Sequence, residues 1–291
     1  MHALLVLTVE GLVQGSIYAA VALALVLIWR ATKVINFAQG AMAMFTTYVA
    51  LVAIHHGLSY WVAFAIAIVC GFALGAVVER VLVRPVEIAS PFNVVILTLG
   101  LYLFLEAIVP MLFGGSIQSF PPAFAITGME LGKVQVPLSG FDIFTFGCLG
   151  VAAVVLTFFF RRTNLGLRMR ASAFSPEVSR LLGIRVGRML TTGWALAAAL
   201  GALAGVLIAP TVLLQPTYMD EVFIFGFTGA ILGGLESLWG SVVGGLVIGL
   251  VLTFVGYVSP DLETLAGLII LTAILMVRPQ GLFSVHRERR V

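Results

Sequence analysis

The sequence predicts an all-α membrane protein, a polytopic bundle of about eight to ten transmembrane helices in one chain. Its 291 residues are 61% hydrophobic and only 10% charged, whereas a soluble protein carries about 25% charged residues. The mean hydropathy of +1.14 is correspondingly high. The apolar residues fall in repeated runs of about 20, which is the length a helix needs to cross the hydrocarbon core of a bilayer.

Nine apolar runs are the candidate spans. The first run is too long for the core of a signal peptide, so we expect it to persist as a membrane helix. Several other runs are short for a full crossing, and the segment 223–257 could form either two spans or one span and a half-helix. The nine runs are 4–28, 34–54, 60–78, 92–113, 141–160, 189–209, 223–238, 241–258 and 263–277.

The positions of the basic residues orient this bundle. Cytoplasmic loops of membrane proteins are enriched in Lys and Arg. If the N-terminus lies outside and nine spans follow, fifteen of the 16 Lys and Arg residues lie inside, and Lys133 is the exception. The sequence therefore predicts an outer N-terminus and a cytoplasmic C-terminus. Adding or removing one pair of spans leaves that orientation unchanged.

The whole chain, 1–291, is predicted to form a single transmembrane domain with two longer loops. The outer loop, 114–140, could act as a lid or docking surface, or could be a plain connector. The inner loop, 161–188, contains seven arginines and one acidic residue. Because such a segment is stable only in water on the cytoplasmic side, a structured basic loop there indicates a docking partner.

Glycines spaced by four predict tight packing of the helices. Small residues at this spacing let helix backbones approach closely in lipid, where apolar burial does not drive association. Chance could account for one or two such pairs in a chain with 31 glycines. The pairs are Gly11/Gly15, Gly71/Gly75, Gly201/Gly205, Gly229/Gly233, Gly240/Gly244 and Gly245/Gly249.

Four polar residues within the spans are candidates for lining a translocation path. Glu10 and Gln14 lie four apart in the first span, and Asn36 and Gln39 open the second, so each pair is expected on one helix face. A carboxylate in the bilayer core costs roughly 2.5–3.5 kcal/mol or more, and it therefore faces the bundle interior or water. The alternative is that these residues form hydrogen bonds between helices or lie at the membrane interface.

Catalytic and nucleotide-binding motifs are missing from the sequence. Neither Lys33 nor Lys133 stands in a phosphate-binding GxxxxGK[ST] loop, and there is no HExxH or CxxC motif. Cys70 and Cys148 lie in separate apolar runs, where they are expected to pack as small apolar residues. We therefore expect no enzymatic activity, cofactor or metal in this chain, and contact with membrane lipid but not with nucleic acid.

A short helix is predicted inside the basic loop. The segment SPE (175–177) combines a serine cap, a proline at the first helical position and an acidic residue at the positive helix end. Glycine at position 183 is a typical helix terminator. Such a helix can lie in the groove of a partner protein or on anionic lipid. Its apolar edge would consist of Leu181, Leu182 and Ile184.

Several of these segments resemble one known family. TNLGLRMRASAFSPEVSRLLGI (163–184) resembles the cytoplasmic coupling loop of ABC importer permeases of the branched-chain amino acid type, the LivH/LivM family. VINFAQGAMAMFTTY (34–48) is similar to the family's NFAHG segment, with Gln39 in place of the frequent histidine. The segments 229–249 and 277–283 are similar to its glycine-rich and C-terminal motifs. In the coupling loop the matching residues are Thr163, Gly166, Arg170, Ala171, Gly183 and Ile184, while Ser179 departs from a common alanine.

This resemblance implies a LivH-like permease subunit that moves leucine, isoleucine and valine across the bacterial inner membrane. It also implies a second, LivM-like permease, two ATP-binding subunits that carry the ATP, and a periplasmic or lipid-anchored binding protein. The alternatives are a permease of this family for urea or short-chain amides, and a self-sufficient secondary transporter or channel. The residues expected to couple to the ATP-binding subunits are Thr163, Gly166, Arg168, Arg170, Ala171, Glu177, Leu181, Leu182, Gly183 and Ile184.

Overall fold

The helices follow the apolar runs closely in the computed structural model, which describes residues 2–87, 91–126, 128–131, 134–278 and 281–282. Lys133 and the three arginines of the C-terminal tail lie outside the described residues. The long helices are α1 (His2–Thr32), α2 (Gln39–His55), α3 (Tyr60–Val77), α5 (Pro91–Phe113), α6 (Gly140–Arg162), α9 (Val186–Ile208), α10 (Tyr218–Gly233), α11 (Leu238–Val258) and α12 (Leu262–Val277). The shorter elements are η1 (Val78–Val83), α4 (Arg84–Glu87), β1 (Gly128–Leu131), β2 (Val134–Ser139), α7 (Asn164–Phe174), α8 (Pro176–Leu181) and η2 (Ala209–Thr211).

Within the described residues, the nine long helices coincide one to one with the nine predicted spans. Six of them are long and apolar enough to cross a membrane. The exceptions are α2, α10 and α12, which have only 16 or 17 residues. The ambiguous segment 223–257 is divided between two separate helices, α10 and α11. The predicted fold class, a polytopic helical membrane bundle, is confirmed.

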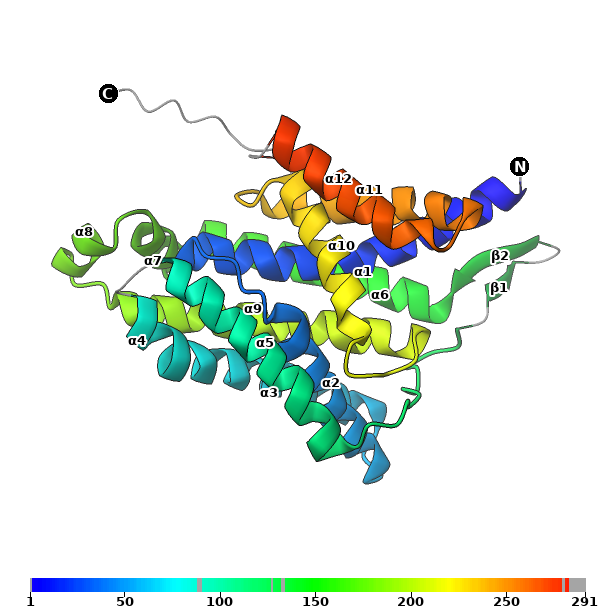
Figure 1. Cartoon of the computed structure of the whole chain (residues 1–291), viewed down its shortest axis with the longest axis horizontal. Helices are drawn as coiled ribbons and strands as arrows, with labels where there is room; N and C mark the ends of the chain where they lie inside the picture. Colours follow the sequence, from blue (N-terminus) through cyan, green and yellow to red (C-terminus); the bar gives the residue numbers. More distant parts are fainter. Residues whose placement is uncertain (1, 88–90, 127, 132–133, 279–280, 283–291) are drawn as a thin grey trace.

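The two ends of the molecule are formed by different parts of the chain. The start of α1 and the β1–β2 hairpin lie at one end, and α4, α7 and α8 lie at the other (Figure 1). The arginine-rich loop therefore lies at the end of the bundle opposite the hairpin. The positive-inside rule assigns this end to the cytoplasm and the hairpin end to the outside.

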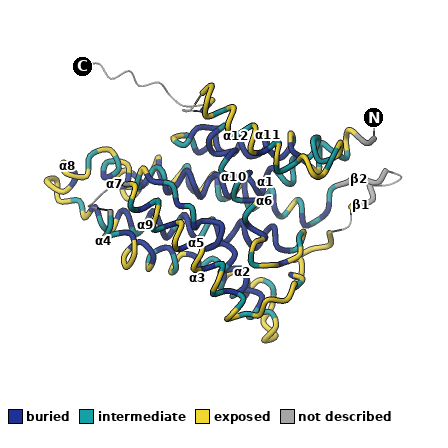
Figure 2. Tube along the Cα trace, viewed as in Figure 1, coloured by how far each residue is buried: buried dark blue, intermediate teal, exposed yellow. Residues whose placement is uncertain are grey.

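Helix α1 forms the centre of the bundle. From Ser16 to Ile28 every one of its residues is buried, and it packs against α9, α10 and α11 (Figure 2). Helices α3 and α5, by contrast, turn large apolar side chains outwards, such as Phe92 (67% exposed) and Met111 (83% exposed) on α5. Since lipid tails are as apolar as these side chains, we expect the outer faces of α3 and α5 to contact lipid.

All six glycine pairs lie at contacts between helices, so the prediction of tight packing is confirmed. Gly11 and Gly15 of α1 face Gly249 and the backbone beside it on α11. On the other side of α11, Gly240 and Gly244 face Gly233 and Gly229 of α10. The pair on α3 packs against α9, and the pair on α9 packs against α2. Chance is therefore not needed to explain any of the pairs.

Replacing Gly249 with alanine should destabilise the protein by about 1–3 kcal/mol, the usual cost of overpacking a dense interior. A Cβ at Gly249 would collide with the backbone of Gly15, and backbone atoms cannot rotate out of the way. Gly147→Ala on α6 is the matched control, because a Cβ there meets nothing within 4 Å. Thermal unfolding of both purified variants checks this prediction, which is wrong if Gly249→Ala is as stable as the control.

The outer loop departs from the all-α prediction. Strands β1 and β2 pair in an antiparallel hairpin, and the valines of β2 are residues that favour an extended chain. Nearby, Gln118 and Leu214 exchange two backbone hydrogen bonds of 3.1 and 2.9 Å. The loop is thereby tied to the segment between η2 and α10.

Candidate functional site

A cavity of about 480 Å³ lies near the outer end of the bundle. It is bounded by the first half of α1, the end of α9, the start of α10, the end of α11 and the start of α12. A volume of this size is typical of sites for small molecules. The cavity is therefore the first candidate for a solute-binding site.

Helix α1 contributes a polar stripe to this cavity. Glu10, which is exposed, and Gln14, which is half-buried, both line it, which agrees with the expectation that they share one helix face. Tyr18, one further turn along α1, lines the cavity as well. The sequence analysis missed Tyr18, although its spacing of four from Gln14 places it on the same face.

Two more carboxylates reach the cavity from distant parts of the chain. Glu221 comes from α10 and Glu263 from α12, and Thr264 donates a 3.0 Å hydrogen bond to Glu221. The described residues that line the cavity include no Lys, Arg or His. The remaining wall is largely apolar and includes Leu7, Ile208, Val212, Val222, Phe225 and Pro260.

Asn36 and Gln39 lie elsewhere, in a buried hydrogen-bond network. The Asn36 amide donates to Gln39 Oε1 (3.1 Å), and Gln39 Nε2 donates to the carbonyl of Ala197 on α9 (2.8 Å). The expectation that both residues stand on one helix face is wrong, because α2 begins only at Gln39. The Asn36 side chain instead accepts the Ala38 N–H, a bond that favours a turn over a helix. The geometry supports the alternative of hydrogen bonds between helices.

The arginine-rich loop forms two short helices, α7 and α8, at the inner end. The Thr163 side chain accepts the Gly166 N–H (3.0 Å) and so caps α7. Gly166 is buried, and a Cβ there would collide with the backbone of Phe159 and Phe160. Thr163 and Gly166 therefore determine how α7 begins and how closely it packs on the end of α6. Arg168 and Arg170 of α7 are exposed, and Ala171 is half-buried.

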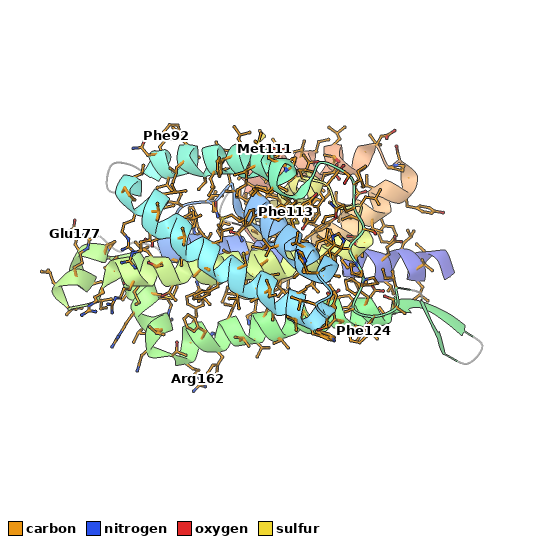
Figure 3. All side chains as sticks on the ribbon, turned by 90° about the horizontal axis from the view of Figure 1, so that it is seen from below. Phe92, Met111, Phe113, Phe124, Arg162 and Glu177 are labelled. Carbon is orange, nitrogen blue, oxygen red and sulfur yellow. The ribbon has the colours of Figure 1, made fainter. Side chains whose placement is uncertain are left out.

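Helix α8 begins and ends as predicted. Ser175 and Pro176 occupy the cap and first helical positions, although the Ser175 side chain makes no capping bond. The chain turns at Gly183, whose φ of +78° lies in the left-handed region that favours glycine. Glu177 is exposed, and it lies at the same end of the molecule as Arg162 (Figure 3).

The exposed apolar edge of this segment lacks one predicted residue and includes two that were not predicted. Leu181 and Leu182 are 87% and 74% exposed, as expected. Ile184, however, is half-buried and packs against the core, because the turn at Gly183 points it towards the bundle. Phe174, which is 85% exposed, was not predicted. The edge therefore consists of Phe174, Val178, Leu181 and Leu182.

An ion pair between the buried Glu79 and the partly exposed Arg84 joins η1 and α4 to the helix that follows α8. Arg84 donates to both carboxylate oxygens of Glu79 (3.1 and 2.9 Å), and Glu79 is only 1% exposed. Arg84 also donates to the Gly187 carbonyl (2.8 Å), while the Thr191 hydroxyl donates to Glu79 (2.6 Å). The first turn of α9 is thereby fastened to the inner end of α3.

Comparison with known proteins adds a family to this geometry. A family model described as the permease component of the branched-chain amino acid transport system matches residues 7–277. The high-affinity branched-chain amino acid transport system permease protein BraD of Pseudomonas aeruginosa is 30% identical, over 97% of this chain and 96% of its own length. The high-affinity branched-chain amino acid transport system permease protein LivH of Escherichia coli K12 is 28% identical, over 97% of this chain and 96% of its own length.

A more remote relative and one solved structure also match. The fructose import permease protein FruF of Bifidobacterium longum is 24% identical, over 76% of this chain and 62% of its own. The structure of PsaBC from Streptococcus pneumoniae in complex with Fab superposes with a TM-score of 0.52, over 93% of this chain and 91% of that chain. Because its sequence identity is only 16%, this likeness concerns the fold alone.

Proposed function

The chain belongs to the permease family of the branched-chain amino acid transport system, and from this premise we propose that it is the membrane-spanning subunit of an ABC importer for leucine, isoleucine and valine. The family match covers nearly the whole chain, and the relatives BraD and LivH are named as permeases for these solutes. The chain is a multi-pass membrane protein. We place it in the bacterial inner membrane, as a single domain that spans residues 1–291.

The partners in this proposal are a second, LivM-like permease, two ATP-binding subunits and a periplasmic or lipid-anchored binding protein. The sequence contains no phosphate-binding loop, so the ATP would be bound by the partner subunits. The exposed outer faces of α3 and α5 suit the surrounding lipid.

The observation that carries the proposal is the exposed apolar edge of α7 and α8. Four large apolar side chains, Phe174, Val178, Leu181 and Leu182, are more than half exposed at the cytoplasmic end. Meanwhile Met169 is buried and anchors α7 to the bundle. Contiguous apolar side chains in water mark an interaction site, and a short helix with such an edge suits a groove on an ATP-binding subunit.

The proposed coupling runs from α8 into the bundle. ATP binding would close the two ATP-binding subunits and move α8, which leads through Gly183 directly into α9. Helix α9 is tied to α4 by Arg84 and to α2 by Gln39. Its last residue, Ile208, lines the outer cavity. A displacement of α8 would thus reach the cavity through one continuous helix.

Affinity purification from native membranes in mild detergent tests this proposal. We expect a second permease, two ATP-binding subunits and a binding protein to accompany the chain, and the purified importer to take up leucine. Uptake of urea or short-chain amides in place of leucine would establish the family alternative. A chain that stays alone under mild crosslinking would contradict the proposal and favour a secondary transporter.

A further inference from the structure

We infer that the outer cavity is a binding site for an aliphatic zwitterion, with its carboxylates facing the ammonium group and the side chains of Gln14 and Tyr18 facing the carboxylate. The inference rests on the proposed function, because an amino acid is such a zwitterion. It goes further by assigning substrate selectivity to the permease itself. The substrate would then be selected twice, first by the binding protein and then by this chain.

The charge of the cavity calls for a cationic group. Glu10, Glu221 and Glu263 come from three different helices, and no basic residue lines the cavity among the described residues. The ion pairs found in the described part of the chain involve none of these three carboxylates. Glu263 is half-buried, whereas Glu10 and Glu221 are exposed. Three carboxylates around one cavity favour a ligand that carries a positive charge.

The arrangement of the carboxylates favours an ammonium group over a metal ion. Within the described residues, no group of three or more His, Cys, Asp or Glu side chains converges closely enough to hold a metal. An ammonium group does not need its partners to converge so closely, because it can donate hydrogen bonds to carboxylates that are spread around a cavity.

Tyr18 provides a second, independent observation. It is 95% buried, lines the cavity and packs edge-on against Phe225, with ring centroids 5.3 Å apart. Its hydroxyl has no hydrogen-bond partner among the described residues, whereas the Tyr218 hydroxyl donates to Thr47 (2.8 Å). Because Tyr18 lines the cavity, its hydroxyl is available to a ligand that accepts a hydrogen bond, as a carboxylate does.

The rest of the lining matches an aliphatic side chain. Ile208, Val212, Val222 and Phe225 form an apolar wall beside the polar groups. In an amino acid with a branched aliphatic side chain, the ammonium group would face the acidic residues and the carboxylate would face the hydrogen-bond donors. The aliphatic side chain would contact the apolar wall. Urea and short-chain amides carry neither charge, so the cavity favours the amino acid.

The test measures ligand binding and uptake with the complete importer. Without the binding protein, we expect leucine to raise the unfolding temperature of the purified complex, and 4-methylpentanoate, which lacks the ammonium group, to have no effect. The double variant Glu221→Gln, Glu263→Gln should lose this protection, and leucine uptake should fall about tenfold or more, since a hydrogen bond to a charged group contributes roughly one power of ten. Tyr18→Phe should lower uptake about tenfold for the same reason.

Two matched controls and one competing cation make the outcome decisive. Glu106→Gln and Tyr60→Phe change the same chemical groups outside the cavity lining, and they should retain wild-type uptake. The inference is overturned if the cavity variants behave like these controls, or if sodium chloride gives the protection and leucine adds none. Failure of the proposed function looks different, because the wild-type importer would then assemble without taking up leucine.

Discussion

Replacing Leu181 with glutamate is expected to abolish ATP-driven uptake and leave the chain folded in the membrane. The side chain is 87% exposed, so its substitution should change the stability of this chain by less than about 0.5 kcal/mol. In the proposed complex the same side chain fills a groove of the ATP-binding subunit. Apolar anchors of that kind contribute about 2 kcal/mol or more to binding, and an unpaired charge in the groove would add a further cost.

Uptake into proteoliposomes and co-purification of the ATP-binding subunits together check this result. Leu282→Glu is the matched control, because Leu282 is an exposed leucine (53%) outside α7 and α8. Unchanged uptake in the Leu181 variant, or an equal loss in both variants, would contradict the docking proposal. If α8 lies on anionic lipid instead, the Leu181 variant should still retain its ATP-binding subunits.

Removing the guanidinium of Arg84 should destabilise the protein. Arg84→Leu would leave the Glu79 carboxylate buried, at 1% exposure, without its charged partner. Breaking a fully buried pair typically costs about 3–5 kcal/mol, and the cost here should lie below that range because Arg84 is 38% exposed and Glu79 keeps its bond from Thr191. We also expect uptake to fall, because the first turn of α9 would lose its bond from Arg84 to the Gly187 carbonyl.

A double-mutant cycle identifies the cause of that loss. Glu79→Gln combined with Arg84→Leu removes both charges, so it should be more stable than Arg84→Leu alone. Arg80→Leu is the matched control, since Arg80 is exposed on the same short element. Equal unfolding temperatures for Arg84→Leu and Arg80→Leu would show that the ion pair does not stabilise the inner end.

Features set by neighbouring residues could be predicted from the sequence. The apolar runs located all nine long helices, because the backbone N–H and C=O groups of a membrane span must form their hydrogen bonds within the helix. The SPE segment and Gly183 located α8, since capping and termination depend on a few adjacent residues. Glu10 and Gln14 were correctly placed on one face by their spacing.

Features set by distant residues could not be predicted in this way. Glu79 and Arg84 are near neighbours, but the carbonyl and hydroxyl that complete their network come from α9. Glu221 and Glu263 lie at or near the starts of two different apolar runs, and only the fold brings them together at the cavity beside α1. Asn36 was misplaced because its own side chain holds a turn that the apolar pattern does not reveal.

The central position of α1 has a consequence for how the protein is made. Helix α1 leaves the ribosome before the helices that enclose it in the finished bundle, and its glycines meet α11, which is synthesised much later. Contacts so distant along the chain form slowly. Until α9, α10 and α11 have been inserted, the contact face of α1 has only lipid or the insertion machinery as neighbours. A nascent chain interrupted before α9 therefore carries an uncovered core, and this intermediate is the one most open to misassembly and degradation.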